Sequence, residues 1–130
     1  VVAAVAMFVV GAVWYMLLFG KKWGEMHGFD KLSKKEQKEM QSKMGPYYGL
    51  QIVITVVSAF VLAKLITLLP DYSVYTLAFL VWLGFVMPSQ VSAVVFGGTE
   101  PRWMVQKIGI MVFESLAHLL VAAFILEKLL

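Results

Sequence analysis

The stretch VVAAVAMFVVGAVWYMLLF, residues Val1 to Phe19, contains no charged and no strongly polar side chain. At about 1.5 Å per residue, a helix of this length comes close to the ~30 Å hydrocarbon thickness of a bilayer. Gly20, Lys21 and Lys22 follow directly and end the apolar run. This stretch therefore predicts a first membrane span over residues 1–19.

Three more apolar runs follow, and turn-forming residues separate them. They predict further spans over residues 46–69, 74–96 and 103–126. Pro46 suits the first turn of its span, because an amide hydrogen there has no helical partner. The Pro-Asp pair at 70–71 and the Gly pair at 97–98 are typical of tight turns. Short connections make neighbouring helices antiparallel, so we expect an all-α fold, an integral membrane four-helix up-down bundle in one domain.

The composition argues against a water-soluble domain. Hydrophobic residues make up 61% of the 130 residues and the mean hydropathy is +0.83, whereas soluble domains contain roughly 45 to 50% apolar residues. A chain of this size cannot bury so large an apolar share in one globular core, so lipid must cover part of it. A cleaved signal peptide is not expected, because no basic segment precedes the first apolar run and no small-x-small site follows it.

Residues 20–45 form the one long hydrophilic segment. Ser33 and Glu36 have the spacing of a capping box, which predicts a short exposed helix over Leu32 to Met44 at the membrane surface. The side of the membrane that holds this segment also holds nine of the eleven basic residues: Lys21, Lys22, Lys31, Lys34, Lys35, Lys38, Lys43, Arg102 and Lys107, against Lys64 and Lys128. The positive-inside rule then predicts a multi-pass protein of the cell membrane, with this loop cytoplasmic and both termini outside.

The last predicted span carries the most informative polar residues. Lys107, Met111, Glu114 and His118 fall within an arc of about 60° on a helix, so they share one face. An acidic side chain near mid-span costs about 2.5 to 3.5 kcal/mol, so Glu114 must contact protein or water, and His118 is the nearest partner. One interpretation is a proton- or cation-responsive site, because burial favours a neutral acid and a protonated imidazole favours its anion. The other is a Glu-His pair that fixes helix packing.

The third predicted span has a proline in its interior. Pro88 lacks an amide hydrogen, so the carbonyl four residues earlier loses its usual partner and the helix should kink. Ser89, Gln90 and Ser92 follow at once. Many transporters place a binding site beside such a break, although kinks also occur for structural reasons alone. Gln51 in the second span is either part of the same interior or an interhelical hydrogen-bond partner.

Other features indicate packing rather than chemistry. Thr55, Ala59 and Ala63, spaced four apart, form a small-residue stripe that predicts a close helix interface. This stripe, and the difficulty of enclosing a pathway with four helices, favour a homo-oligomer, most simply a dimer. The two histidines, His27 and His118, fall on opposite sides of the predicted membrane, so no shared haem or metal site and no cofactor is expected. No cysteine, phosphate-binding glycine loop, zinc-protease motif or serine triad is present, so an enzyme is not expected.

Several aromatic and glycine motifs are similar to those of a known family. Over nearly its whole length the chain resembles the small prokaryotic membrane proteins of the domain of unknown function 1761 family, through Trp14-Tyr15, Phe19-Gly20-Lys21, Trp23 and Trp82-Leu83-Gly84-Phe85-Val86-Met87-Pro88. The resemblance implies four spans and a bacterial or archaeal source, and it implies no activity. We include Trp14, Tyr15 and Trp82 as supporting residues of the candidate site.

Two classes of function fit these observations. The first is a small ion- or proton-linked transporter or channel subunit, with an intramembrane site drawn from Glu114, His118, Lys107, Gln90, Ser89 and Pro88. The second is a non-transporting scaffold or accessory subunit whose lysine-rich loop binds anionic lipid or a cytoplasmic partner. The net charge of +3 is concentrated in that loop. It therefore indicates topology, and no nucleic-acid partner is expected.

Overall fold

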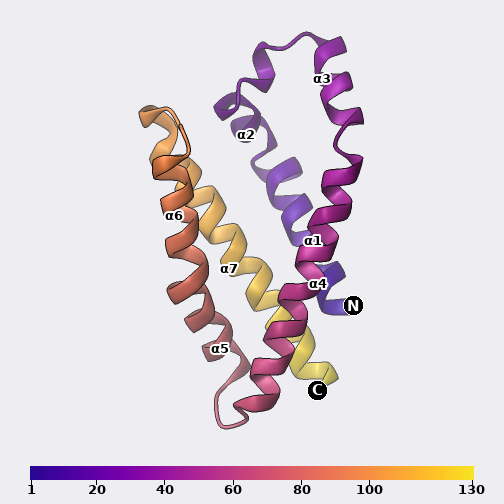
Figure 1. Cartoon of the computed structure of the whole chain (residues 1–130), viewed down its shortest axis with the longest axis vertical. Coiled ribbons are helices and arrows are strands. Elements are labelled where there is room, and N and C mark those ends of the chain that lie inside the picture. The colour runs from indigo at the N-terminus through magenta and orange to yellow at the C-terminus, as the bar shows by residue number, and fades with distance from the viewer.

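A computed structural model describes all 130 residues, and every regular element in it is a helix or a helical turn (Figure 1). The helices are α1 (Val2–Ala12), α2 (Gly20–Met26), α3 (Lys34–Ser42), α4 (Gly45–Leu68), α5 (Val74–Val81), α6 (Met87–Phe96) and α7 (Met104–Leu129). Two π-helical segments, η1 (Val13–Leu18) and η3 (Trp82–Val86), extend α1 and join α5 to α6, and two 3-10 turns, η2 (Phe29–Lys31) and η4 (Pro101–Trp103), lie in the connections. The expected all-α class is confirmed.

Three helical stretches are long and apolar enough to cross a membrane: Gly45–Leu68, Val74–Phe96 and Pro101–Leu129. The first apolar run differs from its prediction. Its helix covers Val2–Leu18, which reaches about 26 Å at 1.5 Å per residue, and α2 then turns away from it by 76°. The two meet the length criterion only when taken together. The structure therefore has three candidate spans, or four if this bent pair is one span.

The bend has a local cause at the end of η1. The amide of Phe19 donates to the carbonyl of Trp14, five residues earlier, at 2.9 Å, and Phe19 itself leaves the helical region with φ −123° and ψ 13°. The π-helical turn is therefore closed before α2 begins in a new direction. Such π-turns are often found at functional sites.

The proline of the third span is accommodated without a break. Pro88 lies in the first turn of α6, directly after η3, and the amide of Met87 reaches back five residues to the carbonyl of Trp82. The wider π-helical turn absorbs the missing proline hydrogen bond, because the helix can shift its hydrogen-bond register there. The predicted interruption is thus a π-helical turn within one continuous span.

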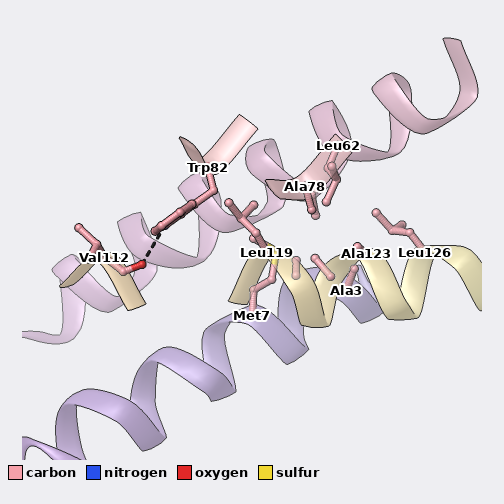
Figure 2. Packing of buried hydrophobic residues seen from close by; sticks show 12 residues of the cluster. Ala3, Met7, Leu62, Ala78, Trp82, Val112, Leu119, Ala123 and Leu126 are labelled. Atoms are coloured by element: carbon pink, nitrogen blue, oxygen red, sulfur yellow. Dashed lines mark hydrogen bonds between the residues drawn. The ribbon is translucent and has the colours of Figure 1, made fainter. Parts of the chain in front are cut away.

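Helix α7 is the central helix of the fold. Within the most apolar stretch of each span, 39% of residues are buried in α7, against 17% in α4 and 11% in the α5–α6 span. It packs against α1, α5 and α6 along its length. The core cluster lies between these helices and α4, and six of its twelve residues are alanines, which allow the helices to approach closely (Figure 2).

The two ends of the molecule differ. Both termini and the α4–α5 connection lie at one end, whereas α2, α3 and the α6–α7 connection lie at the other, which we call the lysine end (Figure 1). At the lysine end α3 is mostly exposed, and the Ser33 hydroxyl caps it by accepting a hydrogen bond from the Glu36 amide at 3.2 Å. The predicted cap is confirmed, with the helix slightly shorter than expected. Pro46 occupies the first turn of α4 as predicted.

The small-residue stripe of α4 faces the interior of the chain. Thr55 and Ala59 are both 6% exposed, and Ala63 packs against the same core. Their helix lies against α1, whose Ala3 and Ala4 belong to this core. The predicted close interface therefore forms within one chain, and the stripe gives no support to self-association.

Candidate functional site

The centre of the candidate site is a Glu-His pair in α7. Glu114 is buried, with 6% of its surface exposed, and its Oε1 lies 2.9 Å from Nδ1 of His118. One proton lies in this contact: either the imidazole N–H donates to the carboxylate or a neutral carboxyl group donates to the imidazole nitrogen. The side chain of His118 is 25% exposed, against 7% for Glu114. The imidazole is thus the more accessible half of the pair.

Helix α1 covers the carboxylate, and glycine makes this approach possible. A Cβ atom at Gly11 would lie 3.3 Å from Oε1 of Glu114, closer than most van der Waals contacts. Tyr15, one turn further along the same helical run, packs its ring against that of Trp23, with ring centroids 4.8 Å apart. The carboxylate therefore sits in the contact between α1 and α7, with no side chain between it and the α1 backbone at residue 11.

A second polar cluster lies on the other side of α7. Ser115 is fully buried next to Glu114 in sequence, and its hydroxyl lies 2.8 Å from Oε1 of Gln90. The indole N–H of Trp82 donates to the carbonyl of Val112 at 2.8 Å (Figure 2). It also donates to the Ser115 hydroxyl at 3.1 Å. Gln90 is thus held by Ser115. No pattern in the sequence singles out Ser115, because a serine in an apolar helix is ordinary.

Two tryptophans fix the turn of α7 that carries Glu114. Trp14 belongs to η1, and its indole N–H donates to the carbonyl of Ile110 at 2.9 Å. Trp82 belongs to η3 and makes the equivalent bond to Val112 from the opposite side. Each π-helical segment thus supplies one indole anchor to α7. The backbone around Glu114 is therefore held from both neighbouring helices.

Lys107 lies apart from the pair. Its Nζ is 3.1 Å from Nε2 of His27 and 5.5 Å from the ring centroid of Trp23. Seven residues of helix separate Lys107 from Glu114, about 10 Å along the axis. The predicted polar stripe is therefore divided: its lysine contacts α2 at the lysine end, and its acid and imidazole form the buried pair.

The residues around Pro88 do not join the pair either. Pro88, Ser89 and Ser92 are exposed on the outside of α6, and the Ser89 hydroxyl donates to the Phe85 carbonyl of its own helix at 2.8 Å. Successive residues on a helix point about 100° apart, so Gln90 turns toward α7 while its neighbours turn away. Gln51 is also exposed. The predicted interior lined by Pro88, Ser89, Ser92 and Gln51 is therefore not formed within the chain.

One stability prediction concerns the Trp82 anchor. Trp82→Phe should lower the free energy of unfolding by about 1 to 3 kcal/mol, because it removes two buried hydrogen bonds and leaves a small cavity. Unfolding in increasing SDS, followed by circular dichroism, would measure the loss. Trp103→Phe is the matched control, because its indole N–H makes no hydrogen bond within the chain. Equal stability of the two variants would contradict the anchoring role.

Comparison with protein families supports the resemblance seen in the sequence. The chain matches the family described as "Protein of unknown function (DUF1761)" over residues 1–127. No curated protein and no solved structure matches it.

Proposed function

We propose that this chain, which belongs to the DUF1761 family of proteins of unknown function, is a small proton-linked transporter or channel subunit. The observation that supports this proposal is the contact between the buried Glu114 and the partly exposed His118, in the most buried of the apolar helices. Ionisable groups inside a membrane are costly to bury and are usually functional. Proton or cation flux in proteoliposomes is the experiment that tests the proposal.

The pair suits proton transfer because its two halves differ in exposure. In the proposed step a proton adds to Nε2 of His118, the imidazole nitrogen that does not contact Glu114. The proton on Nδ1 then passes to Oε1 of Glu114. The products are a neutral imidazole and a neutral carboxylic acid, so the pair gains one proton and loses its negative charge. Charge at this position lies beside the backbone of α1 at Gly11, so proton uptake would change the α1–α7 contact.

A dimer would complete such a pathway. Gln51 and Ser92 are polar and exposed along the apolar helices, where lipid gives their side chains no hydrogen-bond partner. A second copy would cover them. This dimer is a prediction that rests on these exposed polar groups.

For the topology, we infer that Val2–Leu18 and α2 together form a fourth crossing, with the lysine end in the cytoplasm. Eight of the eleven basic residues lie before α4, in the α6–α7 connection or in η4, and the positive-inside rule places such segments in the cytoplasm. A reporter fused after Leu130 should therefore be active outside the cytoplasm. A reporter fused within α3 is the internal control and should be active inside. The reverse pattern would contradict the proposed topology.

A non-transporting scaffold is the alternative function. Helix α3 and its flanks present Lys34, Lys35, Lys38 and Lys43 to solvent, a charge pattern that attracts anionic lipid or an acidic partner. This alternative predicts no flux in proteoliposomes under any gradient. The flux measurement therefore separates the two functions.

A further inference from the structure

An open groove lies between the α1–α2 bend and the first half of α7. Its volume is about 670 Å³. Trp14, Leu18 and Phe113 form much of its apolar wall, and Lys21, Lys22 and Glu25 contribute charges from α2. The groove therefore combines an apolar surface from the membrane helices with a charged rim at the lysine end.

The apolar wall is open to the membrane. Leu18 is 62% exposed and Phe113 is 58% exposed. Leu18 ends the uncharged run of the first helix, and Phe113 lies on α7 next to the buried Glu114. Because α2 turns away by 76° from the preceding helix, the charges of the rim follow this wall directly. An amphiphile with a long apolar chain and a charged headgroup would fit this apolar wall and the charged rim that follows it.

The charges of the rim define the headgroup. Lys21 and Lys22 are exposed, and Nζ of Lys22 lies 5.4 Å from the ring centroid of Trp103. Glu25 also lines the groove, so the rim has two positive charges and one negative charge. A headgroup with a single phosphodiester matches a net charge of this size, whereas Glu25 would repel a more highly charged one.

From these surfaces we infer that the groove binds an anionic glycerophospholipid with one net negative charge. The phosphodiester contacts Lys21 and Lys22, and an acyl chain lies along Trp14, Leu18 and Phe113. Lipid binding here does not require proton transfer at Glu114, because neither Glu114 nor His118 lines the groove.

Gly109 allows the groove to be filled without changing a charge. It lines the groove, and a Cβ atom built on it would meet no atom within 4 Å. Gly109→Leu should therefore project a side chain into the space for the acyl chain. Gly49→Leu on α4 is the matched control, because Gly49 also has open space beside it and lies outside the groove.

Quenching of Trp14 fluorescence by lipids with brominated acyl chains tests the inference. Trp23→Phe and Trp103→Phe would first be combined, leaving Trp14 in the groove and Trp82, which is only 8% exposed and so poorly accessible to lipid. The protein would be placed in phosphatidylcholine vesicles that contain increasing fractions of brominated phosphatidylglycerol or brominated phosphatidylcholine. We expect the phosphatidylglycerol to quench Trp14 at a clearly lower fraction.

Variants inside and outside the groove test whether the preference for phosphatidylglycerol arises there. Lys21→Gln with Lys22→Gln should reduce it by up to about thirtyfold, the size expected for two lysines that each contribute about 1 kcal/mol beside an anionic lipid. Gly109→Leu should remove it as well. Lys34→Gln with Lys35→Gln on α3, and Gly49→Leu, should leave it unchanged. Equal quenching by the two lipids, an equal effect of the α3 lysines, or an unchanged preference in Gly109→Leu would each overturn the inference.

Discussion

Glu114→Gln should leave the protein folded and reduce proton-linked flux to the level of protein-free vesicles. Glutamine is nearly isosteric with glutamate and still hydrogen-bonds to His118, so the α1–α7 contact is retained. It cannot take up or release a proton in the physiological range, so the proposed transfer from Nδ1 of His118 is lost. The measurement is the pH change inside proteoliposomes under an imposed proton or cation gradient, with unfolding in SDS recorded in parallel.

Two further variants are needed to interpret this result. Glu127→Gln changes an exposed acid near the end of the same helix and should leave both flux and stability unchanged. Glu114→Leu removes the partner of His118 and should cost roughly 1 to 3 kcal/mol, the usual range for an unsatisfied buried polar group. In a membrane the average cost is smaller, about 0.6 kcal/mol, because unfolded spans also find partners.

The combination of outcomes separates a site from a packing element. Lost flux with intact stability in Glu114→Gln supports the proton site. Unchanged flux in Glu114→Gln and Glu114→Leu, or a loss of stability alone, would reduce the pair to packing and favour the scaffold function.

The apolar runs predicted most of the fold because burial in lipid depends mainly on composition. The predicted ranges 46–69 and 74–96 agree with the structure to within a residue or so, and the last helix extends three residues beyond the predicted 126. The first run, predicted as a span over residues 1–19, forms a helix over Val2–Leu18, and its crossing stays a prediction because α2 bends away by 76°. Its bend at Phe19 follows a π-helical turn whose Trp14 bonds to α7, and a contact over 96 positions in sequence leaves no local pattern.

The candidate site could be predicted where its geometry is local. Glu114 and His118 are four residues apart, so any α-helix brings them together. The contacts of Lys107 and Gln90 could not be predicted, because helical periodicity does not say which neighbouring helix each face of a helix packs against. Gly11 was missed for a related reason: a glycine in an apolar run is common, and its role appears only when Glu114 is placed opposite it.

The last prediction concerns this glycine. Gly11→Leu should destabilise the protein by about 1 to 3 kcal/mol or more, because its side chain would overlap the Glu114 carboxylate and force α1 away from α7. Gly49→Leu is the control, and it should be neutral or slightly stabilising, since leucine is the better helix former and has open space there. Unfolding in SDS measures both. Equal stability of the two variants would show that α1 does not approach Glu114 closely.

A double-mutant cycle then tests whether the carboxylate itself is what Gly11 accommodates. Gly11→Ala alone places a Cβ 3.3 Å from Oε1 of Glu114, so this contact should offset part or all of the roughly 1 kcal/mol that alanine gains over glycine in a helix. In a Glu114→Ala background that oxygen is absent, and the same substitution should gain up to about 1 kcal/mol from helix propensity. A coupling of at least about 0.5 kcal/mol between the two positions is expected for groups in direct contact. Additive effects would mean that Gly11 is needed to accommodate other atoms of α7. The carboxylate would then have room to move without displacing α1.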